Sequence, residues 1–404
     1  MLLLSMTIIL GTLTIHDAVP LEDQNDVGNP VKRNYRFVEA NNQFALSILN
    51  ALDKKNNIIM SPWSFSMTLG MAYLGASGSS AREMEEVLGY RSAGIERDLV
   101  HDGFRIEESA LKRVHGKNEL SSANVVLVQE GYTLSKSYKD DLKRYYNSST
   151  TEINFTRPQS VLQWVNAWGY WTSNSKIKQI LTETPPKTTK LMLLNGVYFK
   201  GNWLNPFNPE HTRLEDFTNE NGRKVTVPIM HMINNVSYVA YHKLGVYAVN
   251  FPYDGEDINM MVLLPTENNN LNAVEDKLTT AVLEDILAQM EMQTINVGFP
   301  KFELKDDRKM KETLKSLGMQ SAFSENEADF SRIAETRDLY LEEVIHKAVI
   351  QVNENGTEAN ANTVIPLMNK RKLPEFFANR PFLFLIRNMR SGAILFIGHV
   401  VQLE

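Results

Sequence analysis

Hydrophobic positions along the chain recur with two different spacings, which predict where helices and strands lie. In residues 41–52, the apolar side chains of Phe44, Ile48 and Leu52 are four positions apart and share one face of a helix. Residues 190–203 are instead apolar almost without interruption, which is typical of a strand buried on both faces. The chain therefore contains both amphipathic helices and buried strands.

The remaining segments continue this pattern. A strand that starts at residue 57 is broken at Ser61-Pro62, where a helix begins that ends near residue 77. Further helices are expected at residues 81–90, 137–146, 160–177 and 307–319. Further strands are expected at residues 122–130, 246–253, 258–265, 295–304 and 343–354, with a closing hairpin of residues 380–388 and 393–401. Helices come mostly early and strands mostly late, which predicts an α+β fold with a substantial antiparallel sheet.

The composition is that of a large folded domain. The chain has 404 residues, of which 43% are hydrophobic and 22% are charged. No Pro-, Gly- or Ser-rich linker, change in composition or internal repeat divides it, so we expect one domain rather than the two or three that the length suggests. The formal net charge of −6 argues against a nucleic-acid partner, because proteins that bind nucleic acids usually present a basic face.

The first residues predict a secreted, extracellular protein. The apolar run over residues 2–15 is shorter than the roughly 20 residues that cross a membrane, and it is typical of a signal peptide. We therefore expect a signal peptide at 1–15, whose cleavage site could involve Thr12 or Thr14, and a flexible N-terminal lead at 16–34. A buried N-terminal segment is the alternative interpretation. No membrane partner is expected.

The cysteine content and the glycosylation sequons of the chain bear on the expected secretion. The chain has no cysteine, which excludes thiol catalysis and leaves the fold to its hydrophobic core. Candidate glycosylation sites, which a secreted protein can use, are Asn147, Asn154 and Asn235, and a fourth sequon begins at Asn355. Chance occurrence in an Asn-rich chain is the alternative explanation, so the sequons support secretion only mildly.

The sequence shows no pattern of an enzyme active site. The eight histidines include no pair spaced i, i+4 and no HExxH motif, so no zinc site is predicted. The stretch GASGSS (75–80) departs from the nucleophile motif GxSxG at Ser79. We therefore expect no enzymatic activity, no metal and no cofactor.

A group of basic side chains in residues 105–117 has two interpretations. Its members are Arg105, Lys112, Arg113, His115 and Lys117. They could bind a sulfated polysaccharide, but Glu107 and Glu108 interrupt the group. A solvated helix face of mixed charge is therefore the favoured interpretation.

Residues 356–372, GTEANANTVIPLMNKRK, fit neither of the two spacings. On a strand, one face would carry the small side chains of Thr357, Ala359, Ala361 and Thr363, followed by apolar ones, while the other face would begin with polar ones. The segment is therefore either a disordered loop or a latent strand with one face suited to a core.

Several long stretches around this segment resemble motifs of the serpin family. They are NIIMSPWSFSMTLGMAYLGA (57–76), LMLLNGVYFKGNWLNPF (191–207), VIHKAVIQVNENGTEANANT (344–363), ANRPFLFLIRN (378–388) and GAILFIGHVV (392–401). They occur in the family's order and at its separations, and the resemblance covers about residues 35–404.

The resemblance implies both a fold and an activity. The fold would be a single domain over 35–404 with three β-sheets, eight or nine helices and an exposed reactive loop at 356–378. The activity would be suicide inhibition of a serine protease: the protease cleaves the loop, and the freed strand inserts into the main sheet while the acyl-enzyme persists, for which serpins are a standard example. A non-inhibitory member that acts as a carrier, chaperone or storage protein is the alternative. The small side chains on the inserting face favour inhibition.

The resemblance also assigns residues to roles. The hinge of the loop would comprise Glu354, Gly356, Thr357, Glu358, Ala359, Ala361 and Thr363. The switch that controls sheet opening would have two parts. Ser61, Ser64, Asn195 and His346 would form a buried polar cluster under the sheet, with His346 hydrogen-bonded to Asn195 or a serine hydroxyl. Trp203 and Lys301, together with Glu354, would control where insertion begins, at the top of the sheet. The reactive bond would be Lys370–Arg371, with Arg371–Lys372 as the alternative, and a basic residue there suits a trypsin-like protease. We expect the protein to be a monomer whose partner is that protease.

Overall fold

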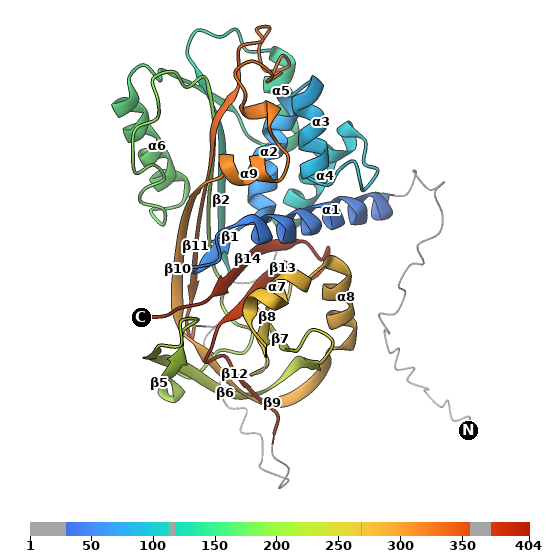
Figure 1. The fold of residues 1–404 in the computed structure, drawn as a ribbon, viewed down its shortest axis with the longest axis vertical. Helices are drawn as coiled ribbons and strands as arrows, with labels where there is room; N and C mark the ends of the chain where they lie inside the picture. The colour runs from blue at the N-terminus through green and yellow to red at the C-terminus, as the bar shows by residue number, and fades with distance from the viewer. Residues whose placement is uncertain (1–29, 113–117, 268, 356–372) are drawn as a thin grey trace, which may run out of the picture.

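The described chain folds into two hydrogen-bonded sheets with helices packed on them (Figure 1). The computed structural model describes residues 30–112, 118–267, 269–355 and 373–404. Its helices are α1 (Pro30–Ala51), α2 (Pro62–Gly75), α3 (Gly78–Val87), α4 (Arg97–Leu111), α5 (Lys136–Tyr146), α6 (Pro158–Thr172), α7 (Leu271–Lys277), α8 (Thr280–Gln289) and α9 (Lys311–Ser316), with single 3-10 turns η1 (Pro209–His211) and η2 (Ser321–Phe323).

The strands of the first sheet run between the two ends of the molecule (Figure 1). Its order is β10-β11-β4-β2-β3, and the bounds are β2 (Glu119–Gln129), β3 (Thr150–Ile153), β4 (Leu191–Lys200), β10 (Phe302–Lys309) and β11 (Leu341–Val352). The two central strands, β4 and β11, are parallel to each other, whereas each is antiparallel to its other neighbour.

The second sheet has nine strands in the order β1-β14-β13-β8-β7-β6-β9-β12, with β5 also paired to β6. The bounds are β1 (Ile58–Met60), β5 (Arg213–Thr218), β6 (Lys224–Tyr241), β7 (Val246–Pro252), β8 (Ile258–Pro265), β9 (Glu291–Pro300), β12 (Glu375–Phe377), β13 (Phe382–Asn388) and β14 (Ile394–Val400). Because the long strand β6 pairs with β7 at one end and with β5 and β9 elsewhere, two of the three expected sheets join into one network.

Helix α2 begins where the sequence pattern indicated, and its start has a clear chemical cause. Ser61 caps the helix, because its Oγ accepts a hydrogen bond from the backbone N–H of Ser64 at 3.2 Å. Pro62 follows at the first helical position, where its missing N–H costs nothing. Every residue of α2 is buried. The helix lies inside the molecule, where it contacts both sheets as well as α1 and α5.

Several boundaries differ from the sequence-based expectation. The first helix starts at Pro30, so residues 30–34 belong to a helix rather than to a flexible lead. The helix expected at 307–319 is divided: β10 continues to Lys309, and only α9 is helical. The proposed signal peptide at 1–15 and the first part of the lead lie outside the described residues. No helix in the described ranges is both long and apolar enough to span a membrane.

Two buried clusters of apolar side chains lie on opposite faces of the five-stranded sheet. The larger one joins the helices α1–α5 and both sheets. The smaller one packs side chains of β2, β4 and β11 against α6 and the segment that follows it, including Val161, Val165, Ile177 and Ile180. Helix α6 and the segment after it therefore cover this face of the sheet.

Candidate functional site

Four of the residues that the resemblance assigned to a switch meet where α2 packs beneath β4 and β11. We call Ser61, Ser64, Asn195 and His346 the switch cluster. Ser61 and Ser64 come from the first turn of α2, while Asn195 and His346 are directly opposite each other in the parallel pair β4–β11. All four are buried. The fold thus joins the start of one helix to the two strands that the resemblance expects to separate.

The contacts of His346 fix its protonation state and tautomer. The backbone N–H of Ser61 donates to His346 Nε2 at 3.1 Å, so Nε2 carries no proton. His346 Nδ1 lies against Asn195 Oδ1, an acceptor, so Nδ1 must carry the proton. Burial, which is the larger cause, and the nearby Arg308 guanidinium together lower the pKa of His346 to about 3. The cluster therefore contains a neutral imidazole with both nitrogens satisfied.

Three further residues, which the sequence did not predict, complete the switch cluster. Asn124 on β2 lies opposite Asn195, and its Oδ1 accepts hydrogen bonds from Asn195 and, at 2.7 Å, from Thr68 Oγ1. Ser122 Oγ lies 2.5 Å from Ser64 Oγ, which also accepts a bond from Asn195 Nδ2 at 2.6 Å. The hydrogen bonds therefore extend across three adjacent strands and α2.

The other two predicted switch residues lie elsewhere. Trp203 follows the end of β4, eight residues after Asn195, which corresponds to about 26 Å along an extended chain. With Lys301 and Glu354 it forms what we call the gate group, at the end of the sheet where β11 leads toward residue 356. The gate group is therefore separate from the switch cluster.

The gate group holds the segment that follows β11. The indole N–H of Trp203 donates to the carbonyl of Asn353 at 2.8 Å, and its backbone N–H donates to the carbonyl of Asn355 at 3.2 Å. The Trp203 ring is buried and stacks on Tyr253 with ring centroids 4.5 Å apart. The last described residues before the reactive loop are thus anchored by a rigid aromatic side chain.

Glu354 adds a charged contact to this anchor. Its Oε2 lies 2.9 Å from Lys301 Nζ, and its Oε1 accepts a hydrogen bond from Thr212 Oγ1 at 2.9 Å. Burial acts to raise the pKa of Glu354, but the hydrogen bonds from Lys301, its own backbone and Thr212 outweigh burial and lower it. Glu354 is therefore held as a carboxylate between β9–β10 and the start of the loop.

Strands β4 and β11 are paired directly along their length. The register runs from Leu191 opposite Leu341 to Lys200 opposite Gln351, with one irregularity near Leu341. No other described strand lies between them. The remaining hinge residues Gly356, Thr357, Glu358, Ala359, Ala361 and Thr363, and the reactive bond Lys370–Arg371, lie outside the described residues.

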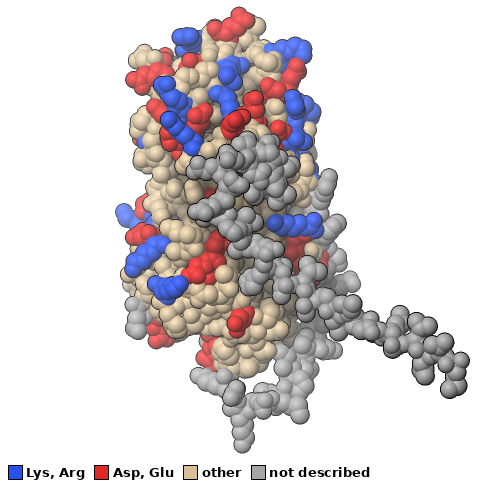
Figure 2. All heavy atoms as spheres, turned by 90° about the vertical axis from the view of Figure 1, so that its right-hand side faces the viewer, with Lys and Arg blue, Asp and Glu red and all other residues tan. Residues whose placement is uncertain are grey.

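The described residues bear on two other candidate sites, a metal site and the basic group in residues 105–117. No group of three or more His, Asp or Glu side chains there could hold a metal ion. In α4, Arg105 pairs with Asp102 at 2.8 Å and Lys112 with Glu108 at 3.4 Å, so both cations have acidic partners on the same helix. The other three basic residues, at 113, 115 and 117, lie outside the described ranges. On the face of the molecule that Figure 2 shows, basic and acidic side chains are interspersed.

Comparison with known proteins identifies the arrangement. The family model described as "Serpin (serine protease inhibitor)" matches residues 39–403. Intracellular coagulation inhibitor 2 of Tachypleus tridentatus is 37% identical over 90% of each chain, and Iripin-1 of Ixodes ricinus is 32% identical over 92% of this chain and 95% of its own. The crystal structure of mouse protein-Z dependent protease inhibitor superposes with a TM-score of 0.85 at 26% identity, covering 93% of this chain and 99% of that one.

These relatives correct the prediction of a secreted, extracellular protein. The relative from Tachypleus tridentatus is named as an intracellular inhibitor, which contradicts that prediction and leaves the signal peptide and the glycoprotein assignment without support. Asn147 and Asn235 have exposed side chains and Asn154 is half-buried. Exposure alone does not indicate glycosylation, since N-linked glycans mark surface loops of secreted proteins.

Proposed function

This chain belongs to the serpin family, whose matched members include protease inhibitors, and on that premise we propose that it inhibits a trypsin-like serine protease by inserting its cleaved reactive loop between β4 and β11. In this proposal the protein is a substrate that traps its protease and has no catalytic centre of its own. The observation that carries the proposal is the parallel pairing of β4 and β11 at the centre of the five-stranded sheet.

The direction of these two strands suits an inserted strand. A chain that leaves the end of β11 and turns back runs antiparallel to β11, and because β4 is parallel to β11 it also runs antiparallel to β4. Insertion would replace one parallel pair with two antiparallel pairs, which are slightly more stable per residue. Thirteen extended residues after Asn355 would span about 43 Å at about 3.3 Å each, enough for the length of β11.

The switch cluster lies on the path of this insertion. His346 on β11 and Asn195 on β4 are hydrogen-bonded to each other across the gap that must open. Separating the strands would break that bond. In the closed sheet His346 is also bound to Ser61 and Asn195 to Ser64, so both side chains hold their strands on α2. We propose that the cluster sets the barrier to opening, while the gate group determines the end at which opening starts.

The proposed target class follows from the residues at the cleavage position. Lys370–Arg371 is the proposed reactive bond, with Arg371–Lys372 as its alternative. A lysine or arginine before the cleaved bond suits a protease whose specificity pocket contains a carboxylate, as in trypsin.

The test is to incubate the protein with a panel of serine proteases of trypsin-like, chymotrypsin-like and elastase-like specificity. We expect an SDS-stable complex with a trypsin-like member, and a released C-terminal peptide that begins at Arg371 by mass spectrometry. A peptide beginning at Lys372 would move the reactive bond by one residue. Cleavage without any SDS-stable complex across the panel would contradict inhibition and favour a carrier or storage role.

A single hinge substitution separates inhibition from simple cleavage. Thr357 would be the first side chain to enter the sheet, so Thr357→Arg would bury an unpaired charge and slow insertion. We expect cleavage at the normal rate, with the fraction of protease trapped as SDS-stable complex falling at least about tenfold.

The matched control is Glu358→Arg, because on an inserted strand residue 358 would lie on the face opposite to residue 357 and would stay in solvent. Trapping by the Thr357→Arg variant at the wild-type stoichiometry would contradict insertion from this hinge.

A further inference from the structure

Helix α6, which lies on the side of the five-stranded sheet opposite to α2 (Figure 1), contains three of the five tryptophans of the chain. Trp164, Trp168 and Trp171 are four and three positions apart, so they lie in one line along the helix, which we call the tryptophan stripe. Trp171 is 75% exposed, more than any other large hydrophobic side chain in the described part of the chain. A contiguous apolar surface of this kind marks an interaction site.

A different face of α6 holds the helix on the sheet. Val161, Val165 and Gly169 are buried and are also four positions apart, but they point into the smaller apolar cluster. A Cβ on Gly169 would lie 2.5 Å from Ile180 Cδ1, so the helix backbone packs closely on the segment that follows it. The position of α6 is therefore fixed without Trp171, whose side chain serves no visible packing role.

The rings of the stripe form a continuous aromatic surface. Trp164 and Trp168 are half-buried at the border of the smaller cluster, and their rings are nearly parallel, with 9° between the planes and 6.4 Å between the centroids. The exposed ring of Tyr170 meets that of Trp171 edge-on, with centroids 5.5 Å apart. Among the described residues, none accepts a hydrogen bond from the three indole N–H groups of the stripe.

Charge along this surface is confined to one end. Helix α6 contains no Asp, Glu, Lys or Arg. Arg157 immediately precedes the helix, is exposed, and lies seven residues before Trp164, so it continues the line of the stripe. No acidic side chain in the described ranges forms an ion pair with Arg157, and the N-terminus of the helix adds partial positive charge there. A complementary partner therefore has an uncharged middle and an acidic end.

A polyproline II helix matches the spacing of the stripe. It rises about 3.1 Å per residue with three residues per turn, so prolines three positions apart are about 9.3 Å apart on one edge. Trp164 and Trp171 are about 10.5 Å apart along the axis of α6, at about 1.5 Å per residue. Aromatic surfaces recognise proline-rich segments in this conformation, whose backbone carbonyls have no internal partners and can accept from indole N–H groups.

We propose that the tryptophan stripe binds a proline-rich segment of a partner protein in the polyproline II conformation, with an acidic residue at the end that meets Arg157. Prolines three positions apart stack on Trp164 and Trp171, and their carbonyls accept hydrogen bonds from the indole N–H groups. The acidic residue pairs with Arg157. This surface is separate from the reactive loop, so the proposal does not rest on protease inhibition.

Isothermal titration calorimetry with synthetic peptides tests the stripe. The probes are hexaproline, which spans about 19 Å, and hexaproline with two aspartates at either its N-terminal or its C-terminal end. We expect all three to bind, and Trp171→Ala to weaken binding at least about tenfold, as truncation of a central tryptophan does at other interfaces. Gln163→Ala is the matched control, because Gln163 is exposed on the same helix but outside the stripe and should leave the affinity unchanged.

The charged end has its own test. One of the two aspartate-bearing peptides should bind more tightly than hexaproline, and Arg157→Gln should remove this gain while leaving the affinity for hexaproline unchanged. An equal gain in Arg157→Gln would overturn the role of Arg157. No binding of hexaproline to the wild type, or equal binding by Trp171→Ala, would overturn the site. Tighter binding of chitohexaose or of phosphatidylcholine vesicles than of any peptide would likewise overturn it, in favour of a glycan or a lipid surface.

Discussion

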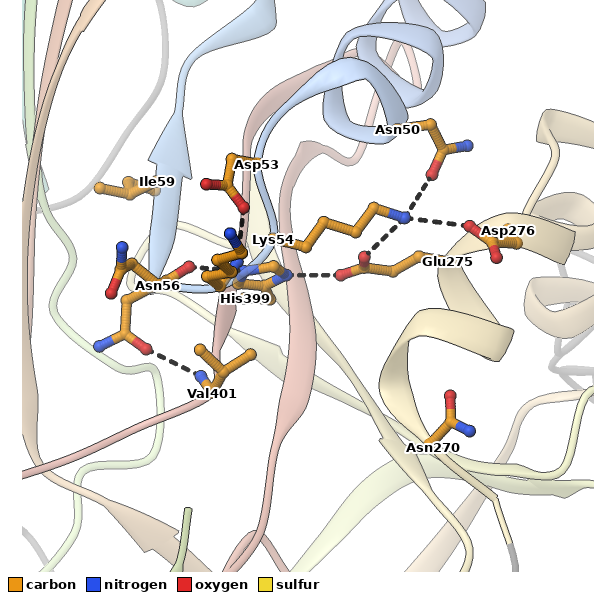
Figure 3. A network of polar contacts seen from close by, with 12 residues as sticks. Asn50, Asp53, Lys54, Asn56, Ile59, Asn270, Glu275, Asp276, His399 and Val401 are labelled. Carbon is orange, nitrogen blue, oxygen red and sulfur yellow. Dashed lines mark hydrogen bonds and ion pairs between the residues drawn. The ribbon is translucent and has the colours of Figure 1, made fainter. Parts of the chain in front are cut away.

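At the scale of single residues, two buried histidines have surroundings of opposite character. His346 accepts a hydrogen bond from a backbone N–H and is surrounded by neutral groups and the Arg308 cation, so burial keeps it neutral. His399 on β14 instead lies between the side chain of Glu275 and the backbone carbonyl of Asn56 (Figure 3). Histidine therefore links two neighbouring strands in one place and joins segments that are distant in the sequence in the other.

The lowered pKa of His346 predicts a loss of stability in acid. In the unfolded chain a histidine takes up a proton at about pH 6.5, whereas folded His346 does so only near a pKa of about 3. Between these values the unfolded state binds more protons, so the free energy of unfolding falls as the pH falls, by up to about 1.4 kcal/mol per pH unit. His101, whose pKa burial also lowers to about 3, contributes with the same sign.

His346→Asn tests this prediction, since an amide can still donate to Asn195 but does not titrate. We expect the variant to be less stable than the wild type at pH 7, with the difference shrinking by roughly 1 to 3 kcal/mol at pH 4.5. Urea unfolding at the two pH values measures it. An unchanged difference, or the same shrinkage in the exposed-site control His242→Asn, would contradict the assignment of the acid sensitivity to His346.

The site residues that the sequence predicted differ from those that it did not predict in what places them at the site. Ser61, Ser64, Asn195 and His346 lie within long motifs, and the resemblance carried them together. Asn124 has no such signal, because it contacts Asn195 only through the antiparallel register of β2 and β4. A pattern within one segment gives the face of a side chain but not the register of its strand against a neighbour.

At the scale of elements, buried strands were predicted well and exposed ones were not. The expected strands at 190–203 and 258–265 correspond to β4 and β8, in which nearly every residue is buried. Strand β10 ends in KDDRK, and its charged side chains led to a helix prediction, although pairing with β11 keeps the backbone extended to Lys309. Charged residues are common on edge strands, where they discourage pairing with other chains, so polarity alone does not exclude a strand.

Strand β12 shows how a small residue anchors the far end of the reactive loop. It is only three residues long and pairs with β9 alone, with Phe377 opposite Gly298. His231 on β6 is opposite Gly298 on its other side, and the rings of His231 and Phe377 meet with centroids 6.0 Å apart. A Cβ on Gly298 would lie 2.4 Å from Phe377 Cδ1, so the glycine is what allows this contact.

Gly298→Ala is therefore expected to displace Phe377 and to lower the free energy of unfolding by about 1 to 3 kcal/mol. The double variant Gly298→Ala/Phe377→Ala tests the cause, because removing the ring should remove the clash. We expect the double variant to be less destabilised than the sum of the two single variants in urea unfolding. Additive effects would show that the cost of the methyl group arises elsewhere in β9.

At the scale of the whole molecule, the two ends of the reactive loop belong to different sheets. Strand β11 of the five-stranded sheet ends just before residues 356–378, and β12 of the nine-stranded sheet lies at the C-terminal end of that segment. While the chain is continuous, the proposed insertion of this segment between β4 and β11 would pull against β12. Cleavage would remove that connection, and the proposed insertion could then proceed.

Cleavage of the reactive loop is accordingly expected to raise the thermal stability. The inserted strand would exchange one parallel pair for two antiparallel pairs, a gain of roughly ten hydrogen bonds at about 1 kcal/mol each. Apolar burial of Ile365 and Leu367 would add to it. For a domain of this size, about 10 kcal/mol corresponds to a rise of the melting temperature of roughly 10 to 20 °C.

Calorimetry of the intact protein and of protein cleaved within residues 356–372 measures this difference. Thr357→Arg cleaved in the same way is the matched control, since it has the same broken bond but a hinge that resists insertion, and it should show most of the rise lost. Equal melting temperatures of intact and cleaved wild-type protein would mean that the β4–β11 pair stays closed after cleavage. The direct pairing of Asn195 and His346 would then be a permanent part of the core rather than a switch.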